Sequence, residues 1–299
     1  MLRVPGAAWA GGDARAEGTR LRVLLAPGPV LARLAEASAP STAPAAREAL
    51  DEAETGPDAG GRLDPLAELY APPRRDWVRV NLVTTLDGAI AGADGTSESL
   101  TSPLDRRILR VIRDAADAVV VGASTVRQEP RLLTPGMRLV VVTATGDLSG
   151  HSLPAARLDD VTVVHPPAAR AAVERTLPGA RRLELAPSAD SGDGADAAST
   201  ADAAAAPGLD LRAVVDALAE RGLRSLVLEG GAATIAAALS ADVVDELCLN
   251  TSPALSAGAA NAPRLTAGAA DPATPRFDLT HALLDDTGFL FTRRARPCR

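Results

Sequence analysis

The chain has 299 residues, 46% of them hydrophobic and 23% charged, which is typical of one or two globular domains with a substantial core. The net charge of −7 at pH 7 argues against general nucleic-acid binding, because that function needs a basic surface. No apolar run approaches the roughly 20 residues of a membrane span, and the N-terminus lacks an apolar stretch of signal-peptide length. We therefore expect a cytoplasmic protein that binds neither nucleic acid nor membrane.

Cysteines and histidines are few and scattered. Cys248 and Cys298 form no CxxC pair, and each of the three histidines stands without a cysteine or carboxylate at ligand spacing. This pattern favours a reducing compartment and predicts no metal site.

Residues 1–76 are expected to form an N-terminal arm that is partly disordered. They hold one short apolar run, Leu21 to Leu25, followed by sequence rich in Ala, Pro and Glu. Such a composition buries little apolar surface. The folded body, residues 77–299, should therefore begin at Trp77.

In the folded body, apolar runs alternate with amphipathic stretches, which indicates strands separated by helices. Ser102 and Pro103 have the residue types that begin a helix, and Asp210 should cap a second helix that ends at Gly222. A short Ala-rich helix should run to Leu239. Strands are expected at 78–83, 118–121, 139–142, 161–164, 181–185, 225–228 and 243–249. This order predicts an α/β fold with a mostly parallel central sheet and helices on both faces.

Two further segments have distinct patterns. Residues 187–208 are low in complexity, and we interpret them as a mobile insertion because strands and helices resume unchanged after them. Residues 288–293 alternate between apolar and polar types, which is typical of an exposed edge strand.

Four sequence blocks lie where strands end, the place where open α/β sheets bind ligands. They are NLVTTLDGAIAG, TSPLDRRILRVIRDAADAVVVGASTVRQEP, LVLEGGAATIAAAL and VDELCLNTSPALSAG. In this order, over roughly residues 77–294, they resemble the conserved blocks of the pyrimidine reductase domain of riboflavin biosynthesis. The resemblance implies a dihydrofolate-reductase-like fold, NADPH as cofactor, and reduction of the ribosyl group of a phosphoribosylamino-pyrimidine by a homodimer. Bifunctional relatives also carry a zinc deaminase, which needs a His/Cys cluster, but residues 1–76 contain neither residue type, so we expect a stand-alone reductase.

The Glu-Gly-Gly block can also be interpreted from its residues alone. Gly230 and Gly231 would let a backbone approach a pyrophosphate closely, at a helix start that offers free N–H groups. A tight strand-to-helix turn would use the same glycines. The resemblance implies that the cofactor contacts Gly230, Gly231, Ala232, Ala233 and Thr234, and also Thr101, Asp105, Thr125 and Thr143. Asp105 has a second explanation, because it completes a capping box with Ser102.

Glu129 is the predicted catalytic residue. The resemblance implies that this carboxylate lies beside the reacting ribose and the nicotinamide, where it would stabilise positive charge or relay a proton. On chemistry alone, a solvated loop acid fits Glu129 equally well. The resemblance also implies four substrate-binding residues, which are Asp87, Ser97, Arg113 and Glu229.

Two departures from the family pattern leave other functions open. One residue is missing after Glu129, and Ser99 stands where many relatives have Trp. The alternatives are a dihydrofolate- or pterin-type reductase on the same fold, or a non-catalytic relative that binds a nucleotide.

Candidate arginines for the 2′-phosphate of NADPH are Arg106, Arg107 and Arg127.

Overall fold

The computed structural model describes residues 64–130, 132–187, 209–256 and 275–297 with their side chains, and the backbone of three strands near the N-terminus. The strands are β1 (Ala7–Ala8), β2 (Gly12–Ala16), β3 (Thr19–Pro27), β4 (Trp77–Thr84), β5 (Ala118–Gly122), β6 (Leu139–Val142), β7 (Val161–His165), β8 (Arg181–Glu184), β9 (Ser225–Gly230), β10 (Glu246–Thr251), β11 (Asp278–Asp285) and β12 (Leu290–Ala295). The α-helices are α2 (Pro65–Tyr70), α3 (Pro103–Asp114), α4 (Ala123–Gln128), α5 (Arg170–Thr176), α6 (Leu211–Glu220) and α7 (Ala232–Ser240). Short 3-10 helices are η2 (Glu98–Leu100), η3 (Ala155–Asp160) and η4 (Pro167–Ala169).

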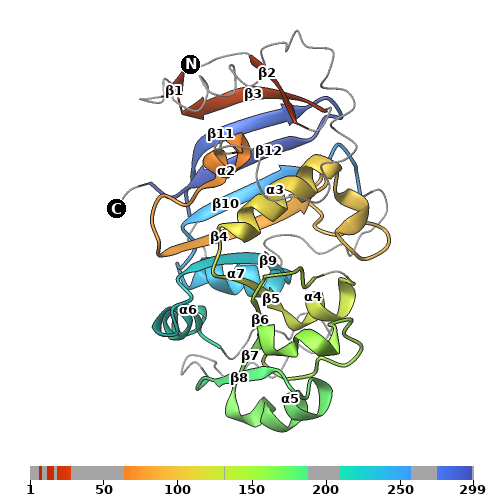
Figure 1. Ribbon diagram of the computed structural model, residues 1–299, viewed down its shortest axis with the longest axis vertical. Helices are drawn as coiled ribbons and strands as arrows, with labels where there is room; N and C mark the ends of the chain where they lie inside the picture. The colour runs from red at the N-terminus through yellow and green to blue at the C-terminus, as the bar shows by residue number, and fades with distance from the viewer. Residues whose placement is uncertain are drawn as a thin grey trace.

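One sheet organises the described chain, in the order β1-β3-β11-β12-β10-β4-β9-β5-β6-β7-β8, with β2 paired to β3 (Figure 1). From β10 to β8, every neighbouring pair is parallel. β12, β11 and β3 add antiparallel pairs at the β10 side. The predicted α/β class with a mostly parallel sheet is confirmed.

The helix boundaries follow from local residue chemistry. Ser102 caps α3, since its Oγ accepts a hydrogen bond from the Asp105 N–H at 3.1 Å, and Pro103 fills the first turn. Asp210 caps α6 in the same manner, accepting from the Arg212 N–H at 2.9 Å. Gly222, with φ of +82°, ends that helix region in the left-handed conformation that favours glycine. Both predicted helix starts are confirmed.

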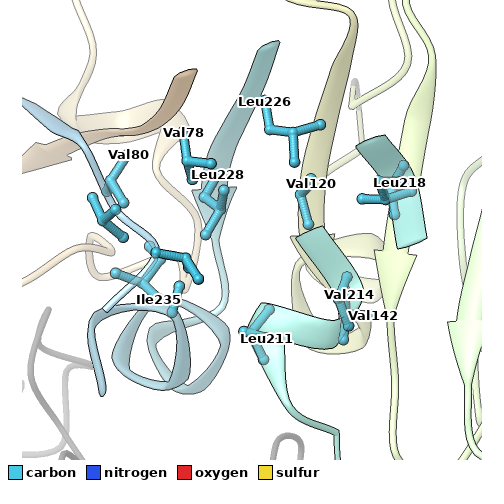
Figure 2. Close-up of a cluster of buried hydrophobic side chains, with 14 of the residues drawn as sticks. Val78, Val80, Val120, Val142, Leu211, Val214, Leu218, Leu226, Leu228 and Ile235 are labelled. Atoms are coloured by element: carbon cyan, nitrogen blue, oxygen red, sulfur yellow. The ribbon is translucent and has the colours of Figure 1, made fainter. Parts of the chain in front are cut away.

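Helices cover both faces of the sheet, as expected. On one face, α6 and α7 pack on alternate residues of the central strands (Figure 2). The buried residues labelled there are Val78, Val80, Val120, Val142, Leu211, Val214, Leu218, Leu226, Leu228 and Ile235. On the other face, α2 and α3 pack over β4, β10 and β12, while α4 and α5 pack over β5, β6 and β7. The parallel strands are apolar on both sides because both sides are covered.

The prediction of an exposed edge strand at 288–293 is wrong. β12 lies inside the sheet between β10 and β11, and Phe289 and Phe291 are buried under α2 and α3. Its neighbour β11 lacks a clean alternation of apolar and polar residues, so the sequence did not indicate the strand that covers this edge.

The N-terminal arm contributes more to the core than expected. Leu66, Leu69 and Tyr70 of α2 are buried against α3 and the sheet, so packing begins before Trp77. The apolar run Leu21 to Leu25 lies in β3, whose backbone pairs with β11. Residues 188–208, nearly all of the expected mobile insertion, lie outside the described residues.

Candidate active site

A cavity of about 730 Å³ opens at the carboxyl ends of the central strands. Its walls come from β4, α3, the start of α4, the end of β9 and the start of α7. This is the edge at which open parallel sheets bind ligands. Residues expected at the site that do line it are Ser97, Thr101, Asp105, Arg113, Thr125, Glu129, Glu229, Gly230, Gly231, Ala232 and Ala233.

Three expected residues do not line this cavity. Asp87 accepts hydrogen bonds from Thr85 Oγ1 at 2.7 Å and from the N–H and Oγ of Ser256. Those hydrogen bonds, with Ser256 first, lower the pKa of Asp87 and tie two loops together. Thr143 is buried and accepts from the Gly146 N–H at 3.0 Å. Thr234 is also buried, one turn into α7.

Glu129 is half-buried and is held in place by hydrogen bonds. It follows the last residue of α4, and its Oε1 accepts hydrogen bonds from the N–H of Ser97 at 3.0 Å and from Ser97 Oγ at 2.9 Å. Both residues line the cavity. The loop that carries Ser97 therefore fixes the orientation of the carboxylate at the cavity wall.

Glu229 and Arg113 form a bidentate ion pair. Glu229 is in β9, and its two carboxylate oxygens accept from Arg113 Nε at 2.7 Å and Nη2 at 2.5 Å. The side chains are only 7% and 11% exposed, respectively. Burial disfavours the guanidinium charge, but the hydrogen bonds and charge of Glu229 outweigh it and raise the pKa of Arg113. Pairing explains how a carboxylate can lie at the end of an apolar strand.

Asp105 has a buried carboxyl group and only half of the predicted capping box. Its N–H donates to Ser102 as that motif requires, but the carboxyl group turns inward. There it accepts from Thr101 Oγ1 at 2.5 Å and from Asn250 Nδ2 at 2.6 Å. Burial raises the pKa of Asp105, against the lowering effect of these hydrogen bonds. The carboxyl group thus joins α3 to the centre of the sheet.

Close packing surrounds the Gly230–Gly231 turn. Gly231 has φ of +76°, and a Cβ on it would lie 3.3 Å from the Cα of Gly122. A Cβ on Gly230 would lie 2.8 Å from Thr125 Oγ1. The starts of α4 and α7 therefore approach each other through glycines, and the turn is also needed by the fold itself.

The candidate arginines differ in where they point. Arg106 lines the cavity and pairs with Glu98 at 2.9 Å. Arg107 pairs with Asp64, and Arg127 donates to the carbonyl of Asp147; neither of these two arginines lines the cavity.

Among the cavity-wall residues that were not predicted from the sequence, Arg110 and Asn81 have polar side chains. Arg110 is exposed on α3 and has no hydrogen bond or ion pair with the described residues. Arg110 lies four residues after Arg106 and three residues before Arg113. This spacing would have placed the three arginines on one face of the helix. Asn81 is an isolated polar residue in the apolar strand β4, and no local sequence pattern marked it as a site residue.

Within the described residues, no group of three or more His, Cys, Asp or Glu side chains is arranged to hold a metal ion. None of the helices in this part of the chain is long and apolar enough to cross a membrane.

Comparison with known proteins gives concordant matches. The model of the RibD C-terminal domain family matches residues 76–291. A 2,5-diamino-6-ribosylamino-4(3H)-pyrimidinone 5′-phosphate reductase of Methanothermobacter thermautotrophicus is 28% identical over 193 residues, which is 62% of this chain and 81% of the relative.

Solved structures share the fold. A pyrimidine reductase-like protein of Corynebacterium diphtheriae aligns with a TM-score of 0.57 and 20% identity, over 75% of this chain and 93% of that one. A diaminohydroxyphosphoribosylaminopyrimidine deaminase/5-amino-6-(5-phosphoribosylamino)uracil reductase of Thermotoga maritima aligns with a TM-score of 0.54 and 22% identity, over 75% of this chain and 57% of that one. At these identities the likeness establishes the architecture, in agreement with the dihydrofolate-reductase-like fold expected from the sequence.

Proposed function

Because the chain belongs to the RibD C-terminal domain family, we propose that it is the NADPH-dependent reductase that converts the ribosyl group of a phosphoribosylamino-pyrimidine to a ribityl group. The archaeal relative is named as a reductase of this substrate class. The substrate is thus a small pyrimidine that carries a sugar phosphate, and the reaction is an oxidoreduction with a nicotinamide cofactor.

The observation that carries this proposal is the convergence of distant sequence blocks on one cavity. Ser97 meets Glu129 across 32 residues, and Arg113 meets Glu229 across 116 residues. Both pairs line the cavity together with the Gly230–Gly231 turn. A cavity whose polar groups are fixed by such pairs suits a small ligand whose orientation must be controlled.

The cavity fits a dinucleotide on one structural test. The start of α7 lines the cavity through Gly231, Ala232 and Ala233, and the first N–H groups of a helix have no partner within it, so they can bind a phosphate. We assign cofactor binding to the seven expected residues that line the cavity, which are Thr101, Asp105, Thr125, Gly230, Gly231, Ala232 and Ala233. Arg106 is the candidate for the 2′-phosphate because it alone of the three expected arginines reaches the cavity. NADPH, when bound, supplies the hydride.

The chain's own residues supply position and charge. Glu129, oriented by Ser97, places a fixed negative charge where positive charge develops on the sugar carbon that is reduced. Arg113 and Glu229 form one wall of the substrate site. Arg113 is already paired, so our candidate for the substrate phosphate is Arg110, which lies one helical turn away and has no partner among the described residues.

The direct test is reduction of the two pyrimidines that the relatives' names suggest. NADPH oxidation is followed with 5-amino-6-(5-phosphoribosylamino)uracil, with its 2,5-diamino-pyrimidinone counterpart, and with dihydrofolate as the alternative substrate. We expect turnover of at least one of the pyrimidines, with NADPH used far better than NADH. Turnover of dihydrofolate alone would instead favour a pterin-type reductase, and NADPH binding without turnover would favour a non-catalytic relative.

Other expectations remain predictions. The homodimer implied by the family is checked by light scattering of the purified chain. The cytoplasmic location is checked by fractionation of cells that produce it.

A further inference from the structure

The loop that orients Glu129 is itself held by a carboxylate outside the cavity. Ser97 donates to Glu129 from its backbone N–H and from its hydroxyl group, so both donors must face the carboxylate of Glu129. Asp94 lies three residues earlier in this loop, is exposed, and does not line the cavity. Asp94 is therefore outside the site assigned to substrate and cofactor, and any effect that it has on the reaction passes through its neighbours.

The Asp94 carboxylate holds the residues on both sides of Ser97. Oδ1 accepts hydrogen bonds from the Thr96 N–H at 3.1 Å and from Ser99 Oγ at 2.9 Å, and Oδ2 accepts from Thr96 Oγ1 at 2.8 Å. These hydrogen bonds, those from Thr96 first, lower the pKa of Asp94, so the group is ionised at neutral pH and only accepts. Ser97 thus lies between two residues that one side chain ties together.

The peptide unit between Thr96 and Ser97 is fixed at both ends. Its carbonyl oxygen accepts a hydrogen bond from the Gly92 N–H at 2.8 Å. Its N–H donates to Glu129 Oε1 at 3.0 Å. Because a peptide unit is planar, rotation of this one would move both hydrogen bonds together. Asp94 restrains that rotation, since it holds the N–H and the hydroxyl group of Thr96.

A second side-chain contact, from the same loop to α3, is weaker. Glu98 pairs with Arg106 at 2.9 Å, but both side chains are about half exposed. Ion pairs in contact with water contribute little, because solvent screens the charges and the long side chains lose freedom on pairing. The short Asp94 side chain, with three hydrogen bonds inside the loop, restrains Ser97 more strongly.

We propose that Asp94 is a positioning residue for the reduction, which holds Ser97 so that both of its donors reach Glu129. This inference rests on the proposed function, in which Glu129 is the oriented charge, and adds to it a residue outside the cavity. Misplacing a group at the reacting atoms by about 1 Å can lower turnover about 100-fold. Without Asp94 the loop keeps the hydrogen bond from Gly92 to Thr96, so the expected loss is smaller.

The test measures Asp94→Ala and Asp94→Asn in two backgrounds, the wild type and Glu129→Gln, with the pyrimidine that the wild type reduces. Asp94→Ala should lower kcat about 10-fold and change the NADPH Kd less than about twofold. Asp94→Asn should keep kcat within about twofold of the wild type, because its amide oxygen still accepts from Thr96 and Ser99. In the Glu129→Gln background, Asp94→Ala should change kcat less than about twofold, because the charge that Asp94 positions is already gone.

Asp210→Ala is the control, because it also removes an exposed carboxylate that accepts from a backbone N–H two residues on, but at the start of α6 and outside the cavity lining. It should lower the melting temperature without changing kcat. An unchanged kcat in Asp94→Ala, or a loss of equal size in both backgrounds, would overturn the positioning role. Equal losses in Asp94→Ala and Asp94→Asn would do the same. A wild-type chain that reduces neither pyrimidine would overturn the proposed function itself, and the role of Asp94 with it.

Discussion

The carboxylate of Glu129 accepts two hydrogen bonds from Ser97, a residue 32 positions away in the chain. One comes from the backbone N–H and one from the hydroxyl group, and both reach the same oxygen, Oε1. The second oxygen, Oε2, accepts neither of these bonds. A carboxylate at the end of α4 is thus fixed at the cavity wall by a loop that also lines the cavity.

Glu129→Gln should reduce turnover roughly 10- to 1000-fold, the range expected when one oriented charge is lost. The amide oxygen can still accept from Ser97, so the melting temperature and the NADPH Kd should hardly change. Steady-state kinetics, NADPH fluorescence titration and thermal melts measure the three quantities. Glu174→Gln, in α5 and outside the cavity lining, serves as the control. Loss of activity in proportion to lost stability would make Glu129 a structural residue.

Gly231→Ala should impair both folding and cofactor binding. At φ of +76° a Cβ is strained, and it would also lie 3.2 Å from Thr234 Oγ1 and 3.3 Å from the Cα of Gly122. We expect a loss of unfolding free energy on the order of 1–3 kcal/mol, and an NADPH Kd raised about 10-fold or more. Gly150→Ala is a matched control, because Gly150 has φ of +82° with nothing within 4 Å of its Cβ position. If the Gly231 variant is destabilised but its NADPH affinity is unchanged, the turn serves packing and does not bind the cofactor.

Arg110→Gln should weaken binding of the phosphorylated substrate. The guanidinium of Arg110 is exposed at the cavity and has no partner among the described residues, so it is free to pair with a phosphate. We expect the substrate KM to rise about 10-fold, as for loss of one charge-assisted hydrogen bond. The dephosphorylated pyrimidine should bind the variant and the wild type equally. Arg107→Gln, on the same helix but outside the cavity lining, should not show this phosphate dependence.

Replacing residues 188–208 by a short Gly-Ser linker should leave the fold intact. The segment lacks a periodic apolar pattern, so little buried area should depend on it. β8 before it and α6 after it are held by the sheet and by the apolar core on their own. We expect one cooperative melting transition within about 2 °C of the wild type. Loss of cooperativity would show that the segment belongs to the domain.

The sequence predicted those elements whose signals are local. The apolar run of β6 and the Ser102-Pro103 start of α3 both specify their element through neighbouring residues. β12 was misplaced because its neighbours in the sheet are set by long-range pairing, and the alternation at Phe291 is the same whether a strand is central or at an edge.

For the site, too, the sequence predicted local features but not the contacts between residues far apart in the chain. Eleven of the fourteen residues expected at the site line the cavity, but the pairings between them were not predicted. That Glu229 is neutralised by Arg113, or that Asp105 is held by Asn250, depends on strand order and on the position of α3 over the sheet. Asn81 was missed for the opposite reason, since an isolated polar residue in an apolar strand has no spacing to reveal it.

Buried His281 should make the stability of the protein sensitive to acid. This residue lies in β11, is 1% exposed, and packs edge-on against Tyr70 with ring centroids 4.9 Å apart. Burial first, then the charges of Arg293 and Arg79, lower the pKa of His281 from 6.5 to about 3. The unfolded chain therefore binds a proton at this position below pH 6.5, and the folded chain does not. The stability that the neutral imidazole contributes is complete above pH 6.5 and is lost as the pH falls toward 3.

His281→Phe keeps the aromatic contact and removes the proton, so its unfolding free energy should fall less steeply than that of the wild type between pH 6.5 and 5. The difference in slope should approach the limit for one proton, about 1.4 kcal/mol per pH unit. Urea unfolding at closely spaced pH values measures it. The window lies above the range in which Glu246, whose pKa is lowered from 4.5, begins to add its own acid sensitivity. His151→Gln, at a half-buried histidine far along the chain, is the control. In the wild type, His281 takes up a proton when the chain unfolds, and His281→Phe removes that uptake. Equal slopes for the two proteins would therefore show that another group governs acid unfolding.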